Sequence, residues 1–194
     1  MQTTILPGLT ADDSMYEIAA EELALRVPAL PPITWEQFTA PTSWWLVPDE
    51  SGLASRAELT VLETQQSTIR INVWMRPDLR DPGGKPLPHS HPWGFDSYIL
   101  MGAYDEDRYR LGGNQVHTER GVTHQFGSTN RVDRALYHEV TRVHAPGATM
   151  SLMVCGRGER GAWGYLDLST GRHLPVTPDP AFRAKLRNLN PQHR

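Results

Sequence analysis

Hydrophobic and polar residues alternate along five stretches in the second two-thirds of the chain. These stretches are SRAELTVLE (55–63), STIRINVWMR (67–76), DSYILMGAYDEDRYRL (96–111), RALYHEVTRV (134–143) and TMSLMVCG (149–156). A period of two places successive side chains on opposite faces of an extended backbone, so each stretch predicts a β-strand. Turn-forming glycine, proline and asparagine lie between them, and this close spacing predicts an antiparallel all-β sandwich or barrel.

Helices are expected only near the two ends of the chain. Residues 12–27 carry Ser14 and Glu17 at capping-box spacing and end before Pro28, which predicts a helix. Residues 179–190 predict a second, short helix. The proline-rich, aromatic stretch PALPPITWEQFTAPTSWW predicts an irregular connector between the first helix and the strands. The expected organisation is a helix and connector packed on the barrel (1–54), the barrel (55–176) and a helical tail (177–194).

The composition fits a soluble globular protein and argues against several classes of function. Of the 194 residues, 39% are hydrophobic and 21% are charged, and the net charge of -3 indicates no basic surface for nucleic acid. The single cysteine, Cys155, excludes an intrachain disulfide and a cysteine-based zinc site. The start MQTTILPGLTADD lacks the regions of a signal peptide, and no apolar run approaches the ~18 residues of a membrane helix. We therefore expect a cytoplasmic protein without nucleic-acid or membrane partners.

Two histidines stand one residue apart in LPHSHPWGF, with a proline on each side. On an extended strand, His89 and His91 project to the same side, where two neighbouring imidazoles favour one shared divalent metal over two protons. Imidazole nitrogen suits iron, nickel, copper, zinc and manganese alike. The alternative is a surface histidine pair in a proline loop, and the HxH pattern alone does not decide between the two.

The residues around this pair resemble the first motif of the cupins. That family carries a glycine, HxH, a carboxylate a few positions later and a closing glycine, matched here by Gly83, His89, His91, Asp96 and Gly102. The carboxylate of the family is a glutamate, so Asp96 is a departure. Strict alternation places Asp96 on the face opposite His91, whereas a bulge between them would bring it back. Asp96 is interpreted either as a fourth ligand or as an acceptor that orients a histidine.

The cupin resemblance also implies one more histidine ligand from a later strand. His138 lies in a predicted strand, shares a face with Leu136 and Val140, and follows His91 by 47 residues. It is the expected third ligand, and His124 in RGVTHQFG is the reserve. The other histidines are expected to face solvent or to lie in the tail.

The stretch HEVTRVHAPGATMSLMVCG is similar to part of the thiol dioxygenases, the cysteine dioxygenase group of cupins. Those proteins bind iron with three histidines and line their site with Ser-x-His-x-Tyr. Ser151 keeps the serine, but Met153 and Cys155 replace the histidine and tyrosine, which argues against oxidation of cysteine itself. Small bacterial cupin-like proteins resemble the chain more closely, through HSHPWGF, SYILMGAYDE, HEVTRV and GRGERGAWGY over residues 68–166. This resemblance implies a cupin jelly-roll barrel and a three-histidine metal site, but no particular reaction.

An arginine is the main candidate for substrate binding. Arg70, Asn72 and Trp74 share the polar face of STIRINVWMR. If that face lines the barrel, Arg70 can clamp a carboxylate bidentately, as an arginine on a strand before HxH does in the thiol dioxygenases. The alternative is a strand whose polar face meets solvent. The other residues expected in the wall of the site, each of which could equally be ordinary packing, are Trp93, Tyr98, Ser151 and Met153.

Together these features predict a mononuclear non-haem iron oxygenase, dioxygenase or hydroxylase-like. Its substrates would be dioxygen and a small polar metabolite, such as an amino-acid derivative or natural-product intermediate, with Fe(II) as cofactor. Zinc, nickel or manganese in the same site would support a redox-neutral isomerase, epimerase or lyase instead. A non-catalytic ligand-binding cupin is the third interpretation. Cupins often dimerise through their sheets, so the connector with Trp44 and Trp45 covers either a second copy in a homodimer or its own barrel.

Overall fold

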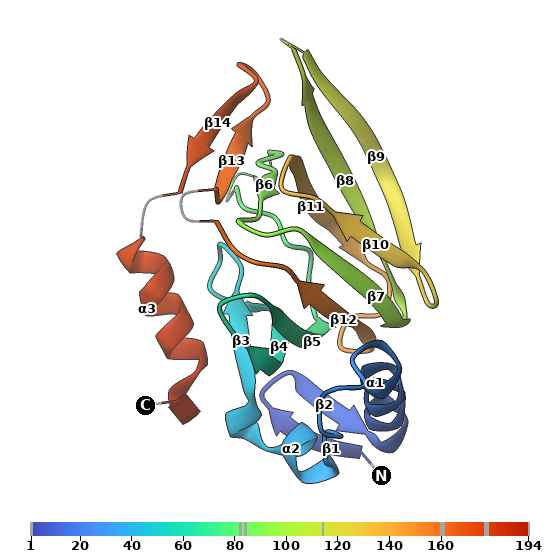
Figure 1. Ribbon diagram of the computed structural model, residues 1–194. Helices are drawn as coiled ribbons and strands as arrows, with labels where there is room; N and C mark the ends of the chain where they lie inside the picture. Colours follow the sequence, from blue (N-terminus) through green and yellow to red (C-terminus); the bar gives the residue numbers. More distant parts are fainter. Residues whose placement is uncertain are drawn as a thin grey trace.

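Two six-stranded antiparallel sheets face each other in the computed structural model (Figure 1), which describes residues 2–81, 83, 85–113, 115–159, 162–176 and 179–193. The first sheet contains, in order, β10 (Thr129–Val132), β7 (Phe95–Met101), β12 (Thr149–Cys155), β5 (Thr68–Trp74), β4 (Ala54–Glu63) and β3 (Trp44–Pro48). The second contains β14 (Arg172–Pro175), β13 (Gly164–Asp167), β6 (His89–Ser90), β11 (Leu136–Val143), β8 (Ala103–Gly112) and β9 (Gln115–Gln125). Arg160 and Gly161 of the GRGERGAWGY motif, and Thr177 and Pro178 at the start of the predicted tail, lie outside the described residues.

The chain passes back and forth between the two sheets. Strands β5 and β7 belong to the first sheet, whereas β6 and β8 belong to the second. Such alternation in a double antiparallel sheet is the arrangement of a jelly roll. The predicted fold class is therefore confirmed: an all-β, cupin-type jelly roll with short helices near both ends.

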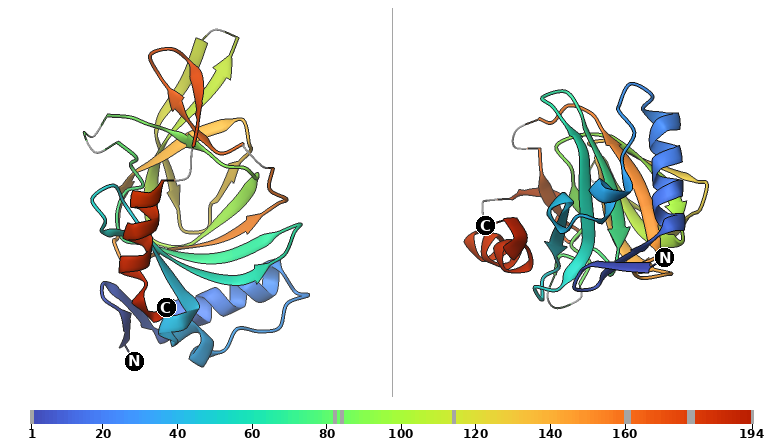
Figure 2. Two further views of the ribbon diagram at one scale, coloured as in Figure 1. Left: turned by 90° about the vertical axis from the view of Figure 1, so that its left-hand side faces the viewer. Right: turned by 90° about the horizontal axis from the view of Figure 1, so that it is seen from below.

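The largest apolar core lies outside the barrel, against the outer face of the first sheet. A hairpin of β1 (Gln2–Leu6) and β2 (Leu9–Asp12) covers this face together with α1 (Asp13–Arg26) and α2 (Trp35–Thr39), as Figure 2 shows from below. Leu9 and Leu23 from this layer share one buried cluster with Ile69, Ile71 and Val73 of β5. Because β5 turns its apolar side outward to this layer, its polar side faces the interior of the barrel.

Helix α1 confirms the predicted N-terminal helix, but its cap differs from the prediction. The Asp12 side chain accepts a hydrogen bond from the Met15 backbone N–H at 2.9 Å, and the Ser14 hydroxyl donates to Asp12 Oδ1 at 2.6 Å. Asp12 therefore caps the helix in the role expected of Ser14, because the helix begins at Asp13 and Ser14 already lies inside its first turn.

Part of the stretch predicted as an irregular connector is regular. Helix α2 has a complete capping box between Thr34 and Gln37, and a 3-10 turn, η1 (Pro41–Ser43), leads into strand β3 at the edge of the first sheet. Trp44 is fully buried, with its ring 5.4 Å from the ring of Phe38. Trp44 therefore covers its own barrel. The division of the chain into residues 1–54, 55–176 and 177–194 remains a prediction, and so does a homodimer.

The long predicted strand 96–111 is divided into β7 and β8 by Gly102. Gly102 has a φ of +68°, and a Cβ there would lie 2.9 Å from Thr149 Cα, so only glycine fits without strain. The chain turns sharply here and passes from one sheet to the other. The sequence pattern did not predict β9, β10, β13 and β14. Strands β9 and β14 are mostly exposed and show little alternation, and β10 and β13 are only four residues long.

The C-terminal helix α3 (Pro180–Leu189), with the 3-10 turn η2 (Pro191–His193), lies along the edge strand β3 (Figure 1). The side chain of Asn190 accepts from the Leu46 N–H at 2.7 Å and donates to the Leu46 carbonyl at 2.8 Å. This side chain takes the place of a neighbouring strand and covers an otherwise unpaired edge. In the described part of the chain, no helix combines the length and apolar character needed to span a membrane.

Candidate metal centre

Three histidines converge inside the barrel. His138 of β11 lies directly opposite His89 of β6 in the antiparallel register, and paired residues project to the same face. His91 follows just beyond the end of β6, two residues after His89. One ring nitrogen from each histidine can be chosen such that all three lie within 4.8 Å of one another. The structure thus brings together the three residues that the sequence and the cupin resemblance select.

The geometry and protonation of these rings fit a divalent metal. His91 Nε2 and His138 Nε2 are 2.9 Å apart, and two nitrogens each about 2.1 Å from one ion at a right angle are separated by about 3 Å. Burial lowers the pKa of His89 and His91 well below the usual range, and a neighbouring positive charge on His138 would lower both further. Both imidazoles are therefore neutral near pH 7 and keep a lone pair for a metal ion.

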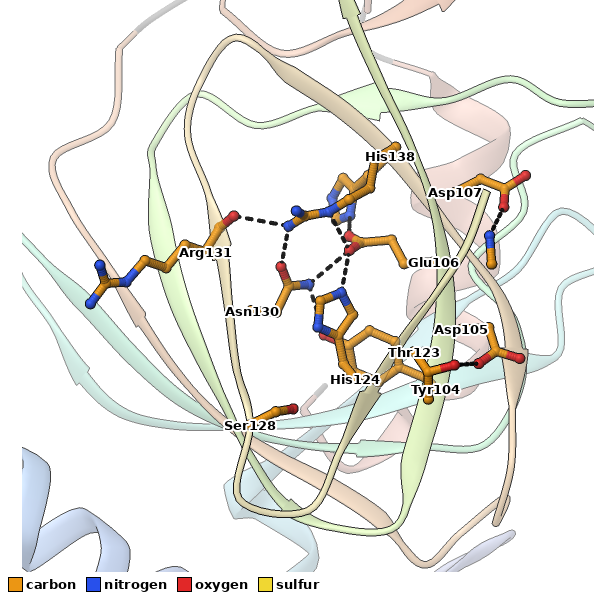
Figure 3. A network of polar contacts seen from close by, with 12 residues as sticks. Tyr104, Asp105, Glu106, Asp107, Thr123, His124, Ser128, Asn130, Arg131 and His138 are labelled. Atoms are coloured by element: carbon orange, nitrogen blue, oxygen red, sulfur yellow. Dashed lines mark hydrogen bonds and ion pairs between the residues drawn. The ribbon is translucent and has the colours of Figure 1, made fainter. Parts of the chain in front are cut away.

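A buried carboxylate holds His138 from behind (Figure 3). Glu106 of β8 is completely buried, and its Oε1 contacts His138 Nδ1. Its Oε2 lies 2.8 Å from His124 Nε2 and accepts from Asn130 Nδ2 at 3.0 Å and from Arg108 Nε at 2.9 Å. Despite burial, which alone would raise it, the pKa of Glu106 is held well below its usual range by His138, His124 and Arg108.

The Glu106 contact determines which nitrogen of His138 is free. An ionised carboxylate can only accept, so His138 carries its proton on Nδ1 and leaves Nε2 available toward His91. A carboxylate bound to the far nitrogen of a histidine is the usual way proteins orient and strengthen a metal ligand. The role that the sequence offered to Asp96, an acceptor behind a histidine, is therefore taken by Glu106.

The histidines open into a cavity of ≈ 370 Å³. Its lining residues are Trp45, Val47, Arg56, Glu58, Arg70, Arg80, His89, His91, Pro92, Trp93, Met153, Trp163, Phe182 and Leu186. This volume falls within the usual range of small-molecule sites, roughly 300–1,000 Å³. The cavity is large enough for a metabolite and reaches two of the three histidines directly.

Arg70 lies in this cavity and not on a solvent-facing strand. Its Nη1 donates to Glu58 Oε2 at 3.1 Å, and its guanidinium lies 5.7 Å from the centre of the Trp93 ring. Of the two alternatives for the polar face of β5, the structure therefore shows the interior one. Trp93 and Met153 also line the cavity. Ser151 is fully buried and accepts from Trp74 Nε1 at 3.3 Å, without being part of the cavity lining.

Two expected site residues point the other way. Asp96 lies on the outer face of β7, where its carboxylate is 3.5 Å from Arg131 and its side chain is 37% exposed. Strict alternation along β7 holds, because no bulge reverses the side of Asp96, and this residue is no metal ligand. Tyr98 shares that outer face and lies 4.4 Å beneath the guanidinium of Arg26 from α1, so it packs against the N-terminal layer and does not contact the site.

The remaining histidines stay away from the cluster. His124, the reserve ligand, is buried but bonded to Glu106, and His117 is exposed on β9. His144 pairs with Asp105 at 2.9 Å, and His173 and His193 lie on other surfaces of the molecule.

Several charged residues of the site were not expected from the sequence. Asp78 Oδ2 accepts from Arg56 at 2.8 Å, and Asp78 Oδ1 lies 2.7 Å from Arg80. These two arginines hold the pKa of Asp78 far below its usual range although burial opposes them. Arg56 also donates to Glu58 at 2.8 Å. The alternation of β4 could have indicated that Arg56 and Glu58 share a face, but Asp78 and Arg80 lie in an irregular segment with no such signal.

The comparisons with known proteins find only distant similarity to solved structures. No family model and no curated protein matches the sequence. KdgF from Halomonas sp. matches with 13% identity and a TM-score of 0.38, over 54% of this chain and 82% of its own. Fe(II)-HppE with an alternative substrate matches with 10% identity and a TM-score of 0.41, over 60% and 57%. Oxalate decarboxylase from Bacillus subtilis matches with 13% identity and a TM-score of 0.37, over 57% and 27%.

These identities and TM-scores are too low to support any argument about activity. This chain also spans only 57% of the HppE chain and 27% of the oxalate decarboxylase chain. The strand order and the converging histidines characterise this chain as a cupin-type jelly roll with a candidate metal centre.

Proposed function

We propose that this chain is a mononuclear non-haem iron oxygenase in which His89, His91 and His138 hold Fe(II). The observation that carries the proposal is the convergence of three histidines at a cavity of metabolite size, two of them buried and one of these oriented by Glu106. When bound, a ferrous ion supplies a redox-active Lewis acid with open coordination positions for a substrate and dioxygen. The substrate we propose is a small polar metabolite, an amino-acid derivative or a natural-product intermediate.

The protein residues bind the substrate and keep water out. Arg70 and Arg80 offer positive charge to an anionic group of the substrate, while Trp93 and Met153 form apolar walls beside the histidines. Glu106 keeps the proton of His138 on Nδ1, which fixes the orientation of that ring. Burial of His89 keeps its ring neutral. These residues provide a low-dielectric site in which charge interactions are strong.

The relation to the thiol dioxygenases is also part of the proposal. The three-histidine donor set and the HEVTRV segment support it. Met153 and Cys155, however, stand where that group has histidine and tyrosine, and Cys155 is buried with its pKa raised to about 12 by burial. We therefore propose a related oxygenase whose substrate is not cysteine.

Metal content tests the site first. The untagged protein, purified without chelators, should contain close to one iron per chain by mass spectrometry, and His91→Ala and His138→Ala should lose it. His117→Ala is the matched control, because His117 is exposed and away from the cluster. Iron retained in both ligand variants would refute the assignment of the ligands.

Oxygen consumption then tests the reaction. Anaerobically iron-loaded protein is mixed with a panel of amino-acid-derived carboxylates, and oxygen uptake that depends on both substrate and His138 is the expected result. Turnover that proceeds equally without oxygen, or with zinc, nickel or manganese in the site, would replace the oxygenase with a redox-neutral isomerase, epimerase or lyase. Ligand binding without turnover under either condition would leave a binding protein.

A further inference from the structure

The cavity beside the histidines has two chemically different ends. Charged side chains gather near the histidines, contributed by strands β4 and β5 and by the segment before β6. Large apolar side chains form the other end: Trp45 of β3, and Phe182 and Leu186 of helix α3. Trp163 also lines the cavity but lies nearer the histidines, because it precedes β13, which pairs with β6. A ligand that fills this cavity must match both ends.

The charged end carries an excess of positive charge. Three arginines, Arg56, Arg70 and Arg80, face two carboxylates, Glu58 and Asp78, so one positive charge has no counterpart in the cavity lining and its direct partners. The Nε atoms of Arg70 and Arg80 are buried and lack a hydrogen-bond acceptor among the described residues. The two carboxylates therefore do not saturate the three guanidinium groups. A cation excess in a largely buried site favours an anionic ligand.

The apolar end is formed by side chains that leave hydrophobic surface exposed. Trp45 is 40% exposed, which is unusual for a residue of this size. Phe182 and Leu186 are four residues apart, so they lie on one side of α3, and both line the cavity. Rings and branched chains in this arrangement suit an apolar body more than a second charged group.

Helix α3 and the turn after it are held in place over this end by contacts with β3 and with the segment that follows β3. Asn190 bonds to both backbone groups of Leu46, and Lys185 Nζ donates to the Glu50 carbonyl at 2.7 Å. The ring of His193 stacks on Trp45, with 3.9 Å between ring centres. The C-terminal segment is thus a fixed wall of the cavity, built on the edge of the first sheet.

From this arrangement we infer that the site takes a small organic anion with an aromatic or branched apolar body. Its anionic group lies at the arginines and its body beneath α3, where Phe182 and Leu186 determine which bodies fit. The inference rests on the proposed function in taking this cavity as the substrate site. It goes further by naming the substrate class and by giving the C-terminal helix a role in specificity.

Three probes separate the two requirements. Phenylacetate has both an anionic group and a ring, acetate has only the anion, and phenylacetamide has the ring without the charge. Each is titrated into the protein as purified, by calorimetry and by fluorescence of the tryptophans that line the cavity. We expect phenylacetate to bind at least about tenfold more tightly than either of the others, as burial of one ring or pairing of one charge predicts.

Substitutions in α3 test the position of the apolar body. Phe182→Ala should weaken phenylacetate binding about tenfold and leave acetate binding unchanged. Phe126→Ala is the matched control, because Phe126 is 70% exposed and lies outside this cavity. Leu186→Ala provides the same test should Phe182→Ala reduce the thermal stability of the protein. Equal binding of phenylacetate and phenylacetamide, equal binding of phenylacetate and acetate, or no effect of both α3 substitutions would overturn the inference.

The outcome is distinguishable from failure of the proposed oxygenase. A protein that binds phenylacetate in the expected pattern but holds no iron and consumes no oxygen would retain the inference and lose the oxygenase. Conversely, iron-dependent oxygen uptake with substrates that lack an anionic group or an apolar body would retain the oxygenase and refute the inference.

Discussion

Replacing Glu106 by glutamine changes the support of the metal centre without changing its ligands. The carboxylate of Glu106 receives contacts from His138, His124, Asn130 and Arg108. Glutamine keeps one acceptor oxygen and replaces the other with an NH₂ group, which donates toward groups that also donate. If the NH₂ group faces His138, the ring loses the acceptor for its Nδ1 proton; if the oxygen faces His138, the NH₂ group meets the donors of Asn130 and Arg108, and the side chain that orients the ring is displaced.

The expected magnitudes follow from these contacts. Loss of a partner behind a histidine ligand typically lowers metal affinity about 10- to 100-fold, which corresponds to about 1.4–2.7 kcal/mol. At least one buried donor is also left without an acceptor, at a cost of about 1–3 kcal/mol in the free energy of unfolding. Both effects should be present in Glu106→Gln, and the metal affinity should fall in protein that remains folded.

The assay is an anaerobic competition between the protein and a chromophoric chelator for Fe(II), with urea unfolding measured in parallel. Glu139→Gln is the matched control. Glu139 is buried next to His138 in the sequence but on the other face of β11, where it accepts from the Leu87 N–H at 2.8 Å. Burial raises the pKa of Glu139 to about 7, and glutamine can keep its hydrogen bond. Unchanged affinity in Glu106→Gln, or equal losses in both variants, would refute the reasoning.

Three further predictions concern the fold. Gly102→Ala should lower the free energy of unfolding in urea by at least about 2 kcal/mol, through backbone strain and the clash with Thr149. Gly113 has a φ of +64° and open space around it, so Gly113→Ala should show the effect of the strain alone. Equal losses in the two variants would contradict the role of the clash. Burial raises the pKa of the Cys155 thiol from 9.0 to about 12. Between these pH values the unfolded chain releases a proton that the folded chain retains, so the free energy of unfolding should fall by about 1.4 kcal/mol per pH unit above pH 9. Cys155→Ala should flatten this slope between pH 8.5 and 10, and an identical slope in the variant would argue against the raised pKa. Asn190→Ala removes both bonds to Leu46 and should make the C-terminal helix cleavable in limited proteolysis, with unchanged resistance as the contrary result.

Local patterns were sufficient for several of the strands and for the two histidines of HxH. Alternation identified β4, β5, β11 and β12, and the spacing of His89 and His91 placed both rings on one side, because side-chain direction along a strand depends only on position. The same rule placed Asp96 on the opposite side, which the structure shows. The third histidine came from the family resemblance, since nothing local relates His138 to His89 across their strand pairing.

The tertiary structure decided which face of each strand is the inside. The sequence alone determined that β5 has an apolar and a polar side, but not that the N-terminal layer covers the apolar side and turns Arg70 toward the histidines. It also did not reveal that Glu106 lies behind His138, or that α3 closes the cavity. Periodicity is a property of neighbouring residues, whereas the inside of a barrel, the partner of a buried charge and the position of a terminal helix depend on contacts between residues far apart in the chain, which form only when the sheets assemble.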